Sequence, residues 1–264
     1  MSSIPATIDT LDTGRRSRLD ARHDRIFRGV LRFCALLVLA ALLGAALSTL
    51  WGGREILFGQ GLHFLTSTAW NPVEDDYGAL APVFGTLVTS LVAIVLAVPV
   101  SFGVAMFLTE IAPNWLRAPA STAVELLAAI PSIIYGMWGL FVFVPFMARI
   151  EPALTDTLGR IPLLGKLFQG PPLGLGLLTA GIVLAVMILP FITSVMREVF
   201  LTVPTRLKES AYALGSTRWE VLWDIVLPYT RSAVIGGIIL GLGRALGETM
   251  AVTFVLGNSY NITS

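Results

Sequence analysis

The chain is poor in the residues from which most metal centres and many enzyme active sites are built. Cys34 is the only cysteine, and His23 and His63 are the only histidines. One cysteine cannot form a disulfide or a CxxC metal site within a single chain, and the two histidines lack ligand spacing. A histidine-based catalytic triad lacks its residues for the same reason. We therefore expect no metal site and no catalytic site in this chain.

A nucleotide-binding loop is also missing from the sequence. The segment 159–166 superficially resembles one, but five residues separate Gly159 from Gly165, and Leu167 follows the lysine. The phosphate-binding pattern needs four intervening residues and then Ser or Thr. We expect no ATP and no other cofactor on this chain, so any ATP hydrolysis must belong to a separate subunit.

Charged residues are scarce as well, at 13% of the chain, whereas 55% of the residues are hydrophobic. The mean hydropathy of +0.79 lies far outside the range of soluble proteins. The composition therefore predicts a membrane protein that crosses the lipid bilayer several times. A net charge of +1 gives no reason to expect a nucleic-acid partner.

Five apolar stretches are long enough to cross a bilayer, which takes about 20 residues. They cover approximately residues 29–50, 82–109, 121–147, 173–195 and 232–256. Basic residues gather before the first stretch and between the fourth and fifth, so the positive-inside rule places both segments in the cytoplasm. The prediction is an all-α bundle with a cytoplasmic N-terminus, in which residues 1–28 form a disordered basic tail and residues 29–256 the transmembrane domain.

Two prolines are expected to interrupt the second and third stretches. Pro99 and Pro131 each remove a backbone hydrogen bond, which the nearby Ser101 and Ser132 or a water-lined cavity must replace. Broken helices at membrane depth often mark a translocation path, although proline kinks are also common in ordinary membrane helices.

The outer loop at residues 70–78 contains three consecutive acids, which cannot lie in hydrocarbon. The loop is either a solvated turn with a Trp–Tyr anchor at the membrane surface, or part of the surface that receives an external binding protein.

The fifth stretch carries two charges, Arg244 and Glu248, which are four residues apart and are expected to share a helix face and pair. Each charge near the middle of a bilayer costs about 2.5 to 3.5 kcal/mol, so the pair must face a bundle interior. Glycines four residues apart let a partner helix approach closely, and the stretch has two such steps, Gly237 with Gly241 and Gly243 with Gly247. The pair is either a structural ion bridge or a substrate path, in which Arg244 receives an anion and Glu248 limits how tightly it is held.

A polar segment, residues 198–230, separates the fourth and fifth stretches. It contains an acid followed by small residues, a glycine that permits a bend, and an amphipathic turn: Glu209, Ser210, Ala211, Gly215, Trp219 and Leu222. We expect two short helices at an angle, the second ended by Pro228, with Trp219 and Leu222 exposed to the cytoplasm. Such a segment suits docking to another subunit.

The polar segment resembles the EAA loop of ABC importer permeases, whose pattern is Glu, two small residues, Gly, and then Ile-x-Leu-Pro. The matching residues are Glu209, Ser210, Ala211, Gly215, Ile225, Leu227 and Pro228, with Ser210 in place of the usual first Ala. The resemblance implies that this segment couples the permease to its ATPase.

Further motifs resemble those of C-type permease subunits of bacterial phosphate-specific (Pst) ABC importers, over roughly residues 28–262. They are Tyr77-Gly-Ala-Leu, Gly85-Thr-Leu-Val-Thr-Ser90, Ala97-Val-Pro-Val-Ser-Phe-Gly103, Glu125-Leu-Leu-Ala-Ala-Ile-Pro-Ser132, Tyr135-Gly-Met-Trp-Gly139 and Gly241-Leu-Gly-Arg-Ala-Leu-Gly-Glu-Thr-Met-Ala-Val252. The resemblance implies a type I importer permease of the bacterial inner membrane that carries inorganic phosphate into the cytoplasm. It also implies an A-type permease partner, two cytoplasmic ATPase subunits and a periplasmic phosphate-binding protein.

Permeases of this kind carry a sixth span, so residues 257–264 are expected to begin an outer loop at which this chain is truncated. Two alternatives remain open. A permease for another oxyanion, such as sulfate or molybdate, would share the EAA loop and differ in the fifth-stretch motif. A passive channel or a membrane enzyme would not need the docking segment.

Overall fold

The computed structural model describes residues 9–71, 76–158 and 173–256, and almost all of them are helical. Five helical segments are long and apolar enough to cross a membrane, which confirms the predicted number of spans. They are His23–Gly52, Leu80–Ile111, Ser132–Ala153, Leu177–Leu201 and Arg218–Leu246. The chain divides into two units, residues 1–64 and 65–264, which are described separately.

The first unit consists mainly of one long helix, α1 (Asp9–Gly52), followed by the short helix α2 (Arg54–Gln60). The apolar side chains of α1 from residue 23 to residue 52 are exposed all around the helix within this unit, which suits contact with lipid. Residues 9–28 are helical, so the prediction of a disordered tail is wrong for them. Leu, Ala and Arg are good helix formers, and they extend the helix beyond its apolar part. Helix α3 (His63–Thr66) leads into the second unit.

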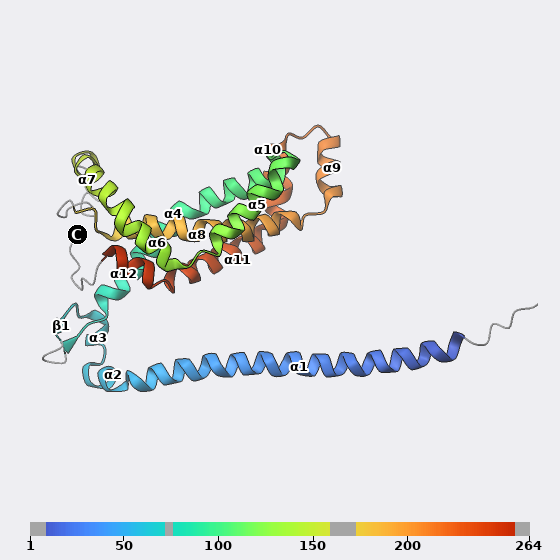
Figure 1. Cartoon of the computed structure of the whole chain (residues 1–264), viewed down its shortest axis with the longest axis horizontal. Coiled ribbons are helices and arrows are strands. Elements are labelled where there is room, and N and C mark those ends of the chain that lie inside the picture. Colours follow the sequence, from blue (N-terminus) through green and yellow to red (C-terminus); the bar gives the residue numbers. More distant parts are fainter. Residues whose placement is uncertain (1–8, 72–75, 159–172, 257–264) are drawn as a thin grey trace, which may run out of the picture. The chain divides into compact units, whose positions relative to one another are not determined.

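The second unit is built around α8 (Leu177–Leu201), which packs against α4 (Leu80–Met106), α5 (Asn114–Ala128) and α11 (Leu227–Leu246). Figure 1 shows these helices running side by side. Most of α8 is buried, and its core side chains are Met187, Ile188, Ile192, Met196 and Phe200. This helix is therefore the axis of the bundle.

A smaller core lies at the end of the unit away from the polar segment. It joins α8 to α6 (Ser132–Trp138), the π-helix η2 (Gly139–Phe143), α7 (Val144–Leu158) and α12 (Met250–Leu256). Its buried side chains are Val144, Ala180, Val183 and Val255.

The two prolines that were expected to interrupt spans behave differently. Helix α4 continues through Pro99, and the hydroxyl of Ser101 donates to the carbonyl of Leu189 on α8 at 3.0 Å. The predicted interruption of the second span is therefore wrong. Since the bond from Ser101 crosses to another helix, it fixes α4 against α8 rather than repairing α4.

The predicted third span, 121–147, is divided between two helical segments in the structure, α5 and the continuous run from α6 through η2 into α7. Helix α5 ends at Ala128 and α6 begins at Ser132, because Pro131 has no N–H and disfavours helical backbone before it. The hydroxyl of Tyr135 donates to the carbonyl of Leu127 at 2.9 Å and ties the two helices across this break.

The outer loop contains a short hairpin, in which β1 (Trp70–Asn71) pairs antiparallel with β2 (Asp76–Tyr77). The rings of Trp70 and Tyr77 meet edge to face at 5.2 Å. Three segments discussed above lie outside the described residues: the middle of the acidic loop, the segment 159–166 that superficially resembles a phosphate-binding loop, and the predicted outer segment 257–264.

Close packing at Gly181 in α8 provides a test of this arrangement. A Cβ added there would lie 2.7 Å from Cβ of Val92 on α4, so Gly181→Ala must push the two helices apart. Overpacking of this kind costs about 1–3 kcal/mol, and we expect the Tm of the purified protein to fall by about 3–10 °C. Gly236→Ala on α11, where a Cβ meets nothing within 4 Å, is the matched control and should leave the Tm unchanged or slightly raised.

Candidate coupling segment and anion path

The polar segment folds into two short helices at a bend, as predicted. Helix α9 (Thr205–Ala213) is followed by Gly215, whose φ of +92° lies in the left-handed region, and then by α10 (Arg218–Glu220). The N–H of Ser216 donates to Ala211, and the N–H of Gly215 donates to Tyr212, which closes α9 in a Schellman motif. Only glycine adopts this backbone conformation without strain, so the bend depends on Gly215.

The second helix begins with a capping box but does not end where predicted. Thr217 accepts from the N–H of Glu220 at 3.3 Å, and the carboxylate of Glu220 accepts from the N–H of Thr217 at 2.6 Å. The chain then continues through the π-helix η4 (Val221–Val226) directly into α11. Pro228 lies in the first turn of α11, where its missing N–H is tolerated, so the prediction that it ends a helix is wrong.

Several large apolar side chains of the polar segment are exposed. Leu214, beside the bend, is 88% exposed, and Trp219 is 57% exposed. Leu207 and Tyr212 are also exposed, and we call these four residues the apolar group. Sequence reasoning selected only Trp219, although large apolar residues within a polar segment were the available signal for the others.

The remaining residues predicted for this segment lie in different surroundings. Leu222 is completely buried in the main core, so its predicted exposure is wrong. The reason is that η4 places it on the face that packs against the bundle rather than toward solvent. Ala211 is buried too, whereas Glu209 and Ser210 are exposed.

An ion pair between two largely buried side chains joins α9 to the bundle. Nζ of Lys208 donates to Oε1 of Glu110, and the two side chains are 13% and 9% exposed. Glu110 belongs to η1 (Phe107–Ile111), a π-helix that follows α4 directly. Burial, and then the negative charge of Glu110, raise the pKa of the Tyr212 hydroxyl above its ordinary value, while Arg218 opposes this shift.

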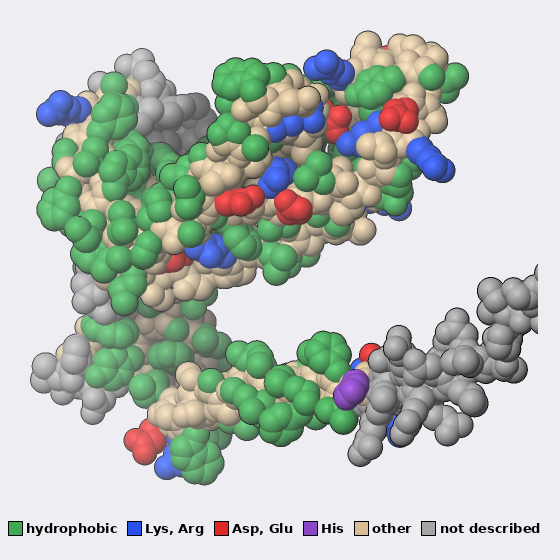
Figure 2. Space-filling view, turned by 45° about the vertical axis from the view of Figure 1, so that its right-hand side comes forward, with side chains coloured by type: hydrophobic (Ala, Val, Ile, Leu, Met, Phe, Trp, Pro, Cys, Tyr) green, Lys and Arg blue, Asp and Glu red, His purple; other side chains and the backbone are tan. Residues whose placement is uncertain are grey.

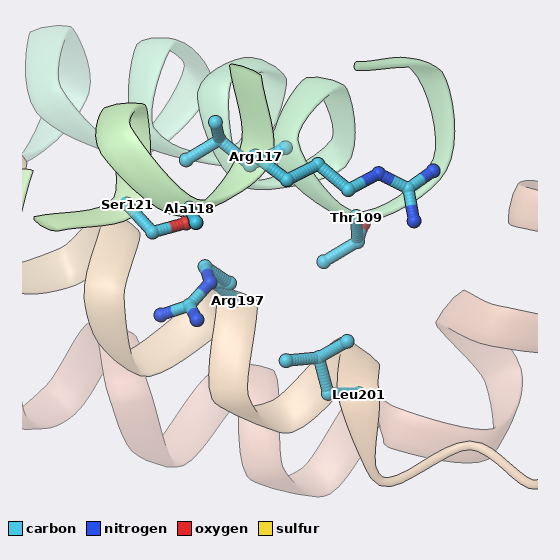
Figure 3. Close-up of a pocket in the computed structure, with 7 residues that line it drawn as sticks. Thr109, Arg117, Ala118, Ser121, Arg197 and Leu201 are labelled. Atoms are coloured by element: carbon cyan, nitrogen blue, oxygen red, sulfur yellow. The ribbon is translucent and has the colours of Figure 1, made fainter. Parts of the chain in front are cut away.

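Charged side chains gather at the end of the second unit that carries α9 and α10, as the space-filling view shows (Figure 2). A pocket of about 260 Å³ lies near this end, lined by Leu108, Thr109, Arg117, Ala118, Ser121, Arg197 and Leu201. Its two guanidinium groups point in opposite directions (Figure 3). Arg197 is paired with Glu125 and Glu198, both at 3.0 Å, and Nε of Arg117 donates to a backbone carbonyl at 2.7 Å. The two cations therefore do not converge on one ligand.

Arg244 lies near the end of α11, but it does not pair with Glu248. Helix α11 ends at Leu246, and the carboxylate of Glu248 accepts from the N–H of Ala251 at 3.1 Å in the first turn of α12. The predicted shared helix face is therefore wrong, because the break at residues 247–249 turns Glu248 to a different partner. The guanidinium carbon of Arg244 lies 5.3 Å from the centre of the Phe191 ring on α8. Within the described part of the chain, no ion pair includes Arg244.

The two glycine steps of α11 face different surroundings. A Cβ at Gly237 would lie 2.9 Å from Val195, and one at Gly241 would lie 2.7 Å from Ile192, so this step is in close contact with α8. Gly243 is exposed and meets nothing within 4 Å, and the nearest atoms to a Cβ at Gly247 belong to the preceding turn of its own helix. The second step therefore lies beside Arg244 on a face that no described residue covers.

Comparison with known proteins decides the family. The profile of the family described as "Binding-protein-dependent transport system inner membrane component" matches residues 97–263. The chain belongs to this family of transport system inner membrane components. Its members form the membrane part of ABC transporters and are not themselves catalytic, so this multi-pass protein works in a complex with other subunits.

Individual relatives share much of this sequence. The "Phosphate transport system permease protein PstC" of Xylella fastidiosa strain 9a5c is 64% identical over all of this chain and 82% of that protein. Proteins of the same name from Pasteurella multocida and Haemophilus influenzae are 57% and 54% identical, each over 90% of this chain and over 74% and 76% of their own lengths. A solved inward-facing MetNI methionine ABC transporter matches 64% of this chain and 68% of that chain, with a TM-score of 0.45 and 24% identity.

The hydrogen bond from the N–H of Ala251 to Glu248 leads to a prediction about the thermal stability of substituted variants. Glu248→Ala removes the acceptor, which is worth about 1 kcal/mol, and should lower the Tm by about 3 °C. Glu248→Gln keeps an acceptor oxygen and should lower the Tm less. Equal losses for the two variants in thermal unfolding would show that this bond does not hold the start of α12.

Proposed function

We propose that the chain is the C-type permease subunit of an ATP-driven importer that carries inorganic phosphate into the cytoplasm. The relatives named as phosphate transport permeases support the substrate, because they match nearly the whole chain. None of the relatives described above favours sulfate or molybdate. The single observation that carries the proposal on the structural side is the environment of Arg244.

Arg244 is an exposed cation, and the other residues of 233–246 in the same part of α11 are all apolar. A charge that faced lipid there would cost about 2.5 to 3.5 kcal/mol or more, so this face of α11 must meet another subunit or a water-filled path. Arg244 also lies just before the break between α11 and α12, and broken helices at membrane depth commonly form substrate sites. Since no carboxylate of the described residues pairs with it, its guanidinium is available to an anion.

The uncovered face of α11 also supports a second permease as the partner. Gly243 and Gly247 beside Arg244 permit a partner helix to approach closely, and we assign that helix to an A-type permease subunit. The phosphate path then runs between the two permeases, with Arg244 on one of its walls.

The polar segment supports docking of an ATPase. Its apolar group is exposed at the bend, and short amphipathic helices of this kind bind in hydrophobic grooves. Two cytoplasmic ATPase subunits would drive the importer, one on each permease. Phosphate would be delivered by a periplasmic binding protein.

The distribution of basic residues supports the orientation in the inner membrane. The end of the second unit with α9 carries Arg117, Arg197, Arg206, Lys208 and Arg218, whereas Arg149 is the cation at the opposite end among the described residues. The sequence adds Arg160 and Lys166 to the predicted outer segment 148–172, which still leaves the α9 end richer in basic residues. The positive-inside rule places the basic end in the cytoplasm, and with four spans before the polar segment the N-terminus is cytoplasmic too.

Substitution of Arg244 tests the phosphate path. Arg244→Gln should abolish uptake of radiolabelled phosphate by cells or proteoliposomes, because an uncharged side chain offers the anion no counter-charge. Assembly should be retained, since Arg244 makes no ion pair within the described chain. Excess sulfate and molybdate serve as competitors in the wild-type assay, and neither should reduce phosphate uptake.

The double variant Arg244→Gln with Glu248→Gln distinguishes this path from an ion bridge that would form only in the assembled transporter, since the two residues do not pair in the described chain. A bridge predicts that the uncharged pair restores uptake, whereas the path predicts that uptake stays lost. Near-normal phosphate uptake by the double variant would contradict the proposed role of Arg244.

Substitution of Gly215 tests the ATPase docking. Gly215→Val should abolish phosphate uptake while the protein remains in the membrane, because a β-branched residue cannot hold the left-handed backbone that presents the apolar group. Gly236→Val on α11, a helical glycine with free space around it, is the matched control. The measurements are uptake and the amount of ATPase subunit that copurifies. Wild-type values of both for Gly215→Val would refute the docking site.

A further inference from the structure

We propose that the ion pair between Lys208 and Glu110 passes movement of the polar segment to α4, so that ATP hydrolysis stays coupled to phosphate movement. The inference rests on the proposed function, in which an ATPase binds the polar segment. It assigns a role to two residues outside the EAA pattern, since Lys208 precedes Glu209 in the sequence and Glu110 lies 98 residues away from Lys208.

The position of the pair is unusual for a stabilising contact. Removing two charges from water is costly, and buried ion pairs are often replaced by apolar residues without loss of stability. The gain from such a pair is a defined geometry, because an ammonium and a carboxylate hold each other in one place. Here the pair holds α9 against the end of α4.

The pair is also a unique polar link within the described residues. The other side-chain hydrogen bonds of α9 and α10 stay within the polar segment, such as those from Ser210 to Arg206 and between Thr217 and Glu220. In that described part of the chain, no second ion pair or side-chain hydrogen bond joins α9 to a spanning helix, whereas α10 is itself the start of the fifth span. Among the polar side-chain contacts of α9, the Lys208–Glu110 pair is therefore the one through which movement of α9 can reach α4.

Glu110 lies at the end of α4, so a displacement of its side chain also acts on α4. The π-helix η1 continues α4 without a break, and the N–H of Ala112 closes it on the carbonyl of Phe107 at 2.7 Å. The carbonyl of Ala112 in turn accepts from Nε of Arg117 at 2.7 Å, which fixes the reversal into α5. Single π-helical turns within α-helices are frequent at functional sites. A displacement of Glu110 thus moves the end of α4 itself.

Helix α4 leads from this point to the proposed phosphate path. Ser101 on α4 donates to the carbonyl of Leu189 on α8 at 3.0 Å. Two residues further along α8, the ring of Phe191 lies against the guanidinium of Arg244. The pair at Glu110, the hydrogen bond from Ser101 and the ring contact of Phe191 thus lie along α4 and α8, which run side by side (Figure 1), between Lys208 and Arg244. Coupling between distant sites can be carried by packed helices of this kind, and the experiment below measures whether it is.

The test uses the whole transporter, purified with its other subunits and reconstituted into proteoliposomes. Phosphate transported per ATP hydrolysed is measured for an apolar pair, Lys208→Met with Glu110→Met, and for a reversed pair, Lys208→Glu with Glu110→Lys. The apolar pair should assemble, because such replacements are commonly neutral for folding. We expect its transport ratio to fall by about three- to thirty-fold, and the reversed pair to recover to within about twofold of wild type.

Glu125→Gln is the matched control, because it removes the exposed Arg197–Glu125 pair, which lies outside α9 and α10. Its transport ratio should equal that of wild type. A wild-type ratio for the apolar pair, with the ATPase bound, would overturn the inference and leave the docking proposal standing. An equal loss in Glu125→Gln would also overturn it, because the effect would not be specific to α9. Failure of the ATPase to copurify with the wild-type permease would instead contradict the proposed function itself.

Discussion

The fold depends on how closely α4 and α11 can approach α8. Hydrophobic burial does not drive helices together in lipid, so association relies on close packing and on small residues at the contacts. Gly181 brings α4 against α8, and Gly237 and Gly241 bring α11 against α8. Both neighbours are therefore held in register with the same central helix. A change in the position of either one has to be accommodated by α8.

The basic side chains discussed above have three different kinds of partner in the second unit. Lys208 and Glu110 neutralise each other in a buried pair, whereas Arg197 is paired with two exposed carboxylates. Arg244 has an aromatic ring beside it and, within the described chain, no carboxylate partner. A guanidinium against a ring keeps most of its hydrogen-bonding capacity, since the ring contacts its flat face. This difference supports the two proposals, in which Arg244 is the cation available to a passing anion and Lys208 is a positioning residue.

Sequence reasoning succeeded for several features that local chemistry decides, although it failed at Pro99 and Pro228, which helices α4 and α11 tolerate. Long apolar runs must form helices in a bilayer, because each backbone polar group needs a partner within its own segment, and this constraint yields the five spans. Gly215 allows a left-handed turn, and that turn is present. Pro131 ends a helix where its missing N–H and its effect on the preceding residue act together.

The sequence by itself therefore determined the helical membrane class, the number of spans and the bend of the polar segment. Only the tertiary structure decided which way side chains face. Leu222 is buried because η4 turns it toward the core, and Glu248 bonds Ala251 because the chain breaks after Leu246. The partner of Lys208 lies 98 residues away, so no local pattern predicts it. Hydropathy depends on composition along the chain, whereas pairing depends on the rotation and registry of helices that pack together in space.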